Sequence, residues 1–293
     1  MLLLAGFLLV APPVFLLGPL VGLLLVCRPS TAREWVWLLG LVAWSALWLQ
    51  QTGGLGGQLV RAAAVLLTGA FVALTLWRPS NRLGQAVAAT GLAAAALAAW
   101  MGRLGIAPAA VRRAIEADLG TYARALQSQV ADSASRELLQ ELVRAGGTVA
   151  QLYPALMALG AIAGLRLAWA WYHRIAARPL GAAPLPFTAF GFSDQMVWGW
   201  VLALSLYLFG PGGWHTAGAN LLMIWAALYA VRGLAVFSAG SARVPAPVIA
   251  TLAVIAMFLL PFVAGGLLLL GLADTWLDFR RRLATPSTGG FDL

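Results

Sequence analysis

The chain has 293 residues, of which 61% are hydrophobic and only 10% are charged, and its mean hydropathy is +0.86. Soluble domains carry about 25% charged residues, so this composition excludes a soluble globular protein, whose surface would need more polar groups. The net charge of +9 arises without a single lysine, because all 19 basic residues are arginines. They lie mostly in short segments between apolar runs, which is typical of a membrane protein and argues against a nucleic-acid partner.

Apolar tracts of membrane-spanning length recur along the chain. A bilayer core of about 30 Å needs roughly 20 apolar residues per helix. The first tract, 1–26, contains Pro12-Pro13, so it is either one tilted helix or two short ones. It has no basic segment before it and is therefore expected to be retained rather than cleaved as a signal peptide. Six further helices are predicted at 35–50, 59–77, 83–101, 148–172, 196–209 and 216–238.

The last apolar tract, 246–276, contains Pro261 and Gly265-Gly266. Arginine-bearing loops alternate with loops that lack arginine, and the positive-inside rule places the former in the cytoplasm. The arginine triplet at 280–282 then lies in the cytoplasm only if the tract 246–276 crosses the membrane twice or bends back near Pro261. We therefore predict an all-α, polytopic transmembrane bundle of about eight helices, within a range of seven to ten, whose C-terminus is cytoplasmic in a bacterial inner membrane.

Segment 102–147 is the one substantial stretch of soluble character, and the predicted topology places it outside. Apolar residues recur at spacings of three and four, which indicates an amphipathic helix that begins near Pro108; they are Val111, Ile115, Leu119, Tyr122, Leu126 and Val130. A second helix is predicted over about 134–144, ending near Gly146-Gly147. The segment either lies on the membrane surface or the bundle, or serves as a lid or docking element.

These features divide the chain into four regions. Residues 1–101 and 148–283 contain the transmembrane helices, and 102–147 is the extracytoplasmic amphipathic segment. The tail, 284–293, is short, polar and rich in Gly, Ser, Thr and Pro, and it is expected to be disordered.

The sequence contains no recognisable motif for catalysis, metal binding or nucleotide binding. Cys27 is the only cysteine, which excludes an intramolecular disulfide or thiolate cluster, and we interpret it as a small apolar residue near a helix end. The two histidines, His173 and His215, have no metal-binding spacing. There is no phosphate-binding loop and no GxSxG. We therefore expect no catalytic residue, no metal and no cofactor, and hence not an enzyme.

Polar residues inside apolar tracts are the best indicators of a site, because such residues cost roughly 2.5–3.5 kcal/mol to insert into lipid. The candidates are Arg166, Asn220, Arg232 and Asp274. Arg166, Arg232 and Asp274 fall at similar depths near the inner helix ends. We predict that Asp274 pairs with Arg232 or, failing that, with Arg166. Alternatively, both arginines extend to the interface and Asp274 is hydrated there.

Several stretches of the C-terminal half carry a family resemblance. They are Leu152-Tyr153-Pro154-Ala155, Pro186-Phe187, the helix start around Trp198, Ala219-Asn220-Leu221-Leu222, Tyr229 to Ala235 with Arg232-Gly233, and the run 270–281 that includes Gly271, Asp274, Asp278, Arg280 and Arg281. In these residues the chain resembles the YybS-type family of predicted bacterial membrane proteins, a domain of unknown function. The resemblance covers about residues 148–283. The family's helix pattern is similar to that of the substrate-binding subunits of energy-coupling-factor transporters.

Two functions from different classes follow as expectations. The first is a small-solute binding or transport component of the membrane, because helices broken at prolines often form transporter sites. The second is a structural or regulatory protein whose outer helices or inner loops bind another membrane protein. A cavity that reaches the polar residues would favour the first, and polar residues packed in protein would favour the second.

Overall fold

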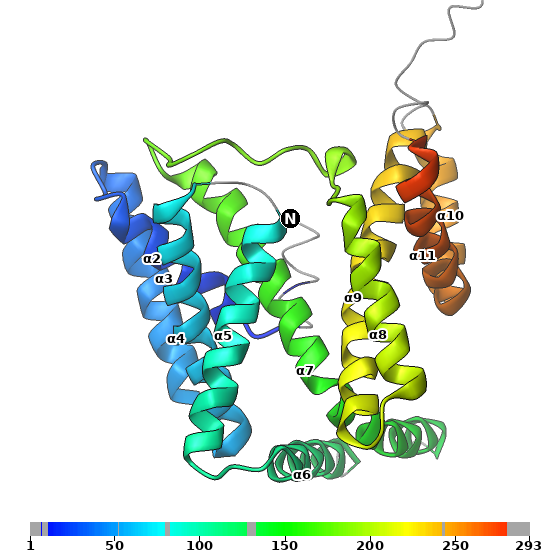
Figure 1. Ribbon diagram of the computed structural model, residues 1–293. Coiled ribbons are helices and arrows are strands. Elements are labelled where there is room, and N and C mark those ends of the chain that lie inside the picture. The colour runs from blue at the N-terminus through cyan, green and yellow to red at the C-terminus, as the bar shows by residue number, and fades with distance from the viewer. Residues whose placement is uncertain are drawn as a thin grey trace, which may run out of the picture. The chain divides into compact units, whose positions relative to one another are not determined.

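In the computed structural model the described residues are 7, 11–51, 53–79, 83–127, 133–241 and 244–279. Every element in these residues is helical, and none is a strand. The chain forms two compact units, Met1–Pro184 and Leu185–Leu293 (Figure 1). The predicted all-helical class is confirmed for the described part of the chain.

Helix α2, Val14–Val26, is the most deeply buried element of the first unit. It packs against α3 (Ala32–Gln51), α4 (Gly54–Trp77) and α7 (Ser133–Ile175). Pro13 lies at its N-terminal boundary, where its missing N–H is tolerated, so the interruption predicted at Pro12-Pro13 lies where this helix begins. At 1.5 Å per residue, its 13 residues span about 20 Å, which is short for a membrane crossing.

Glycines allow α2 to lie close to its neighbours. A Cβ atom added at Gly18 would lie 2.5 Å from Thr68 Oγ1 on α4. One added at Gly164, on α7, would lie 2.7 Å from the carbonyl oxygen of Phe15. Both positions belong to GxxxG motifs, which permit close approach of helix backbones. Both motifs therefore serve helix packing within the chain.

Helix α7 differs from the prediction. The sequence suggested a short helix ending near Gly146-Gly147 and a membrane helix from 148, but the structure has one continuous helix of 43 residues. The predicted helix end is wrong, and the region boundary between 147 and 148 lies inside α7. Glycine disfavours a helix interior by only about 1 kcal/mol relative to alanine, so two glycines do not end a helix whose flanks are both helical.

Helix α6, Pro108–Gln127, follows α5 (Leu83–Arg103) and packs against α7 and α4. Its predicted apolar face lies toward the protein, because Ile115 is buried and Val111 and Leu119 are half-buried. Arg112 and Glu116 are exposed and form an ion pair at 3.6 Å. The start at Pro108 and the orientation of the helix match the amphipathic pattern. Side chains at the other predicted stripe positions, Tyr122, Leu126 and Val130, lie outside the described set.

The described residues of the second unit form the α-helices α8 (Val197–Phe209), α9 (Gly213–Gly240), α10 (Ala246–Phe258) and α11 (Leu260–Leu277). Helices α8 and α9 are antiparallel neighbours (Figure 1). Two short 3₁₀ turns, η1 (Phe187–Ala189) and η2 (Asp194–Met196), precede α8, and η1 lies against α9. The tract predicted to break near Pro261 does so at Leu259, between α10 and α11.

Helices α9 and α11 pack most extensively in this unit. At their crossing, a Cβ atom on Gly233 would collide with the carbonyl oxygen of Leu267, and one on Gly271 would collide with that of Tyr229. Only glycine fits at either position without backbone movement. Gly271 belongs to the family-like motif, so its role there is helix packing.

Five helices in the described residues are long and apolar enough to cross a membrane; they lie at Gly54–Trp77, Leu83–Arg103, Gly146–Ile175, Gly213–Gly240 and Leu260–Leu277. The predicted count of about eight is not confirmed. The reason is length: α2, α8 and α10 have 13 residues each and span about 20 Å. Helix α3 is long enough but has charged and polar residues at its ends.

Candidate functional site

An ion pair joins α9 and α11. The Arg232 Nε donates to Oδ2 of Asp274 at 2.9 Å, and one terminal nitrogen, Nη2, donates to the Asp274 carbonyl oxygen at 3.3 Å. The Asp274 side chain is 0% exposed and that of Arg232 is 6% exposed. The predicted pairing of Asp274 with Arg232 is therefore present in the structure, and Asp274 is not hydrated at an interface.

Burial makes this pair a strong constraint on the fold. A buried charge without a partner is strongly disfavoured, because it loses its hydration with nothing in exchange. Helix α9 has 28 residues, or about 42 Å, so a centred helix would extend about 6 Å beyond each side of a 30 Å core. Arg232 lies eight residues before Gly240, so in a helix centred in this way its Cα atom would lie about 6 Å inside the apolar layer. The pairing keeps both charges tolerable at that depth.

A second carboxylate, that of Asp194, lies on the opposite edge of the guanidinium. Nη1 and Nη2 of Arg232 lie 3.4 and 3.3 Å from Asp194 Oδ1, and Nη1 lies 3.5 Å from the carbonyl oxygen of Phe192. The Asp194 side chain is 69% exposed. Arg232 thus connects a fully buried carboxylate on α11 to an exposed one in η2.

Aromatic rings and hydroxyls surround this arginine. The Phe192 ring lies 5.2 Å from the guanidinium carbon and packs edge-on against Tyr229, and Trp200 contacts Tyr229 from α8. The hydroxyls of Tyr229 and Thr275 are buried near each other, yet neither meets the geometry of a hydrogen bond. Two potential donors therefore lie within the cluster without a well-formed bond.

The sequence did not indicate Asp194 or Phe192, because neither is a polar residue inside an apolar helix. Both residues precede α8 in a segment of irregular backbone and 3₁₀ turns. A signal did exist: Asp194 is the only acidic residue between Glu141 and Asp274. A lone carboxylate next to a helix start is, however, common enough that position alone could not assign it to Arg232.

The remaining predicted site residues lie elsewhere. Asn220 is on α9, three turns before Arg232, and its amide donates to the Thr216 carbonyl oxygen at 3.0 Å. Arg166 lies on α7, in the first unit. Asp278 is exposed at the left-handed C-terminal residue of α11, while Arg280 and Arg281 of the family-like motif, and the tail 284–293, fall outside the described residues.

In the first unit, the Glu34 carboxylate accepts several backbone hydrogen bonds that the sequence did not predict. Its Oε2 accepts the backbone N–H groups of Ser30 and Thr31, each at 2.9 Å, and its Oε1 accepts that of Ala177 at 2.8 Å. The carboxylate thus ties the start of α3 to the segment after α7. These hydrogen bonds to the charged form, first among them the one from Ala177, lower the pKa of Glu34 to about 2.

A second contact lies beside it. The Tyr172 hydroxyl accepts the backbone N–H of Leu180 at 2.7 Å and contacts the Cys27 sulfur at 2.5 Å. Cys27 ends α2, as predicted for a helix end, but its sulfur has a polar partner, so its interpretation as a purely apolar residue is incomplete. Together with Glu34, this contact orders the segment 176–180.

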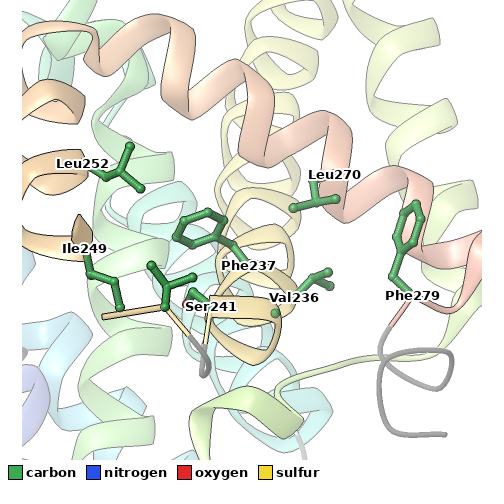
Figure 2. A pocket seen from close by; sticks show the side chains of 9 residues that line it. Val236, Phe237, Ser241, Ile249, Leu252, Leu270 and Phe279 are labelled. Atoms are coloured by element: carbon green, nitrogen blue, oxygen red, sulfur yellow. The ribbon is translucent and has the colours of Figure 1, made fainter. Parts of the chain in front are cut away.

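An open apolar groove of about 470 Å³ lies between α9, α10 and α11 (Figure 2). Phe237 from α9, Ile249 and Leu252 from α10, and Leu270 from α11 project into it. Ser241 is the one side chain in its lining with a polar atom. The groove offers shape and apolar surface but few groups that could orient a polar ligand.

Among the described residues, no group of three or more His, Cys, Asp or Glu side chains could hold a metal ion. The two histidines lie apart in the fold. His173 stacks edge-on with Trp169 near the end of α7, and His215 contacts the Tyr207 carbonyl oxygen at 2.7 Å near the start of α9.

The comparisons with known proteins give one match. No curated protein and no solved structure matches the chain. The profile of a family described as "Predicted membrane protein (DUF2232)" matches residues 2–275, so the likeness extends over nearly the whole chain and well beyond the half that carried the resemblance in sequence. This match is consistent with the YybS-type resemblance. The chain therefore belongs to the DUF2232 family of predicted membrane proteins.

Proposed function

We propose that this chain is a non-enzymatic, multi-pass protein of a bacterial cytoplasmic membrane that binds a small solute at the polar cluster around Arg232. One observation carries the proposal: a guanidinium that is buried and held by Asp274 has its second edge beside the exposed Asp194. Ionisable residues at membrane depth are expensive and commonly mark solute or ion pathways. Because Asp194 is exposed, it offers a solute a route to Arg232.

The helix interruptions support the same function. The chain leaves helical geometry at Leu259, two residues before Pro261, and α2 begins directly after Pro12-Pro13. Discontinuous helices are common in transporters, because their ends offer backbone groups to a ligand. The similarity to substrate-binding subunits of energy-coupling-factor transporters is a fold-level analogy that points the same way.

A structural or regulatory role is the second candidate, and a specific observation favours it. Asp274 and Asn220 are packed within protein, as expected of a scaffold rather than of residues that line a cavity. In this alternative, the exposed face of α6 with Arg112 and Glu116 or the arginine-bearing loops would contact another membrane protein.

Ligand-induced stabilisation distinguishes solute binding from a structural role. A solute at 100 times its Kd stabilises a protein by about 2.7 kcal/mol. We would measure the melting temperature of the purified full-length chain in a maltoside detergent against a panel of neutral, cationic and anionic metabolites. A site-neutral variant, Arg232→Gln with Asp274→Asn, removes both buried charges at once. Asp278→Asn, at an exposed position on the same helix, is the matched control.

We expect at least one solute to raise the melting temperature of the wild type and of the control but not of the double variant. Equal stabilisation of all three proteins would place the binding site elsewhere. A panel without any stabilising solute would contradict solute binding and favour the structural role.

A further inference from the structure

The two edges of the Arg232 guanidinium are held in different ways. On the inner edge, the fully buried carboxylate of Asp274 accepts from Nε at 2.9 Å, and the Asp274 backbone carbonyl accepts from Nη2 at 3.3 Å. On the outer edge, one oxygen of Asp194 is shared between the two terminal nitrogens at 3.3 and 3.4 Å. The inner partner fixes the orientation of the arginine, and the outer partner contacts it more loosely.

Because Asp194 is exposed, it is the one of the two carboxylates that an external anion can replace. Its side chain is 69% exposed, and ion pairs with a solvated partner contribute little to stability because water competes for both charges. Separating Asp194 from Arg232 would return its carboxylate to water, whereas separating Asp274 would leave a charge buried. Arg232 carries one positive charge between two carboxylates, so the cluster accommodates one external anion once Asp194 leaves.

The surroundings of the outer edge suit an anion. A guanidinium offers parallel N–H donors that match carboxylate and phosphate oxygens. The buried hydroxyls of Tyr229 and Thr275 have no well-formed hydrogen bond, and Tyr229 lies within electrostatic range of both Arg232 and Asp194. The Tyr229 hydroxyl is thus a donor that a further anion oxygen can use. The Phe192 ring, 5.2 Å from the guanidinium carbon, covers one face of the arginine.

We propose that the outer edge of Arg232 is a binding site for a carboxylate or phosphate group, and that the Asp194 carboxylate occupies this site until the anion displaces it. The inference rests on the proposed function, in that it names the chemical class of the solute bound at the same cluster. The phosphate can come from a free solute or from a lipid headgroup, because Arg232 lies toward the C-terminal end of α9, eight residues before Gly240.

Isothermal titration of the full-length chain in a maltoside detergent, which contains no phosphate, tests the site with inorganic phosphate and with succinate. Asp194→Asn removes the competing charge and retains the shape of the side chain. It should tighten binding by about fivefold, the equivalent of one exposed ion pair. The site-neutral variant, Arg232→Gln with Asp274→Asn, should lose binding, and Asp278→Asn should bind as the wild type does.

Repeating the titration in phosphatidylglycerol nanodiscs distinguishes the two sources. If a lipid headgroup is the natural occupant, free phosphate will bind in detergent but not in the nanodiscs. If a free solute is the natural occupant, it will bind in both.

Two results would overturn the inference. One is an Asp194→Asn protein whose affinity changes no more than that of Asp278→Asn. The other is the absence of phosphate and succinate binding to both the wild type and Asp194→Asn in detergent. A neutral solute that stabilises the wild type but not the site-neutral variant would leave the proposed function intact while contradicting the anionic class.

Discussion

At the scale of single residues, α9 and α11 carry one charged residue each, and these two form an ion pair. The apolar context of Asp274 predicted that it pairs, because an unpaired carboxylate at that depth is disfavoured. It left Arg166 as an alternative partner to Arg232, and hydration at the interface as the alternative to pairing. Asp194 and Glu34 could not be assigned in this way, since their partners depend on how irregular segments fold against the helices. Asp194 reaches Arg232 from the segment before α8, and Glu34 reaches Ala177 across 143 positions.

The Arg232–Asp274 pair predicts strong energetic coupling. Asp274→Asn alone and Arg232→Gln alone should each lower the free energy of unfolding by about 3–5 kcal/mol, because each leaves the other charge buried. The double variant should lose much less than the sum. Unfolding in detergent measures this cycle, with Asp278→Asn as the exposed control. Additive losses would mean that the two residues do not act as a pair.

The lowered pKa of Glu34 predicts that the stability of the protein falls in acid. Its pKa in the folded protein is about 2, below the ordinary value of 4.5, so its contribution to stability is complete above about pH 4.5 and is lost as the pH falls toward 2. Glu34→Gln should therefore be less stable than the wild type at pH 7, and the difference should shrink through this window. Melting temperatures of both proteins from pH 7 to pH 2 check it. A constant difference would contradict the lowered pKa.

At the scale of elements, sequence periodicity located nearly every helix but misplaced one helix end. The end predicted at Gly146-Gly147 is absent because the helix continues on both sides. The break before α11 lies at Leu259, because Pro261 fits the first turn of a helix and Gly265-Gly266 are tolerated inside it. Proline therefore indicated the interruption more reliably than glycine did.

Glycine packing between α9 and α11 can be tested within one helix. Gly271→Ala should destabilise the protein, because its Cβ would collide with the Tyr229 carbonyl oxygen. Gly265→Ala, where nothing lies within 4 Å of the added atom, should be neutral or stabilise by about 0.5–1 kcal/mol. Melting temperatures of the two variants in the same detergent give the comparison. Equal effects would mean that α9 and α11 do not cross at these glycines.

The orientation of α6 predicts a labelling pattern. With Cys27 replaced by serine, single cysteines at Arg112 and Glu116 should react readily with an impermeant thiol reagent, whereas one at Ile115 should react poorly. Arg112 and Glu116 are exposed and Ile115 is 7% exposed. Equal reaction at all three positions would contradict packing of this helix against α7 and α4.

At the scale of the whole molecule, membership of a family of predicted membrane proteins and five helices of spanning length agree on a membrane-embedded chain. In the second unit, the N-terminus of α8 and the C-termini of α9 and α11 lie at the same end (Figure 1). Trp198, Trp200 and Trp276 fall near these helix ends, as expected of an interfacial aromatic belt. The Arg232 cluster lies toward this end, and the proposed topology makes it cytoplasmic.

Reporter fusions test this account most directly, because access of a cytoplasmic solute to Arg232 depends on the orientation of the chain. Fluorescent-protein and alkaline-phosphatase reporters would be fused after Leu293 and, separately, after Ala131 in the segment between α6 and α7. We predict fluorescence without phosphatase activity after Leu293, since arginines at 280–282 precede it, and the reverse after Ala131. Phosphatase activity after Leu293 would contradict a cytoplasmic C-terminus and place the Arg232 cluster on the opposite side of the membrane.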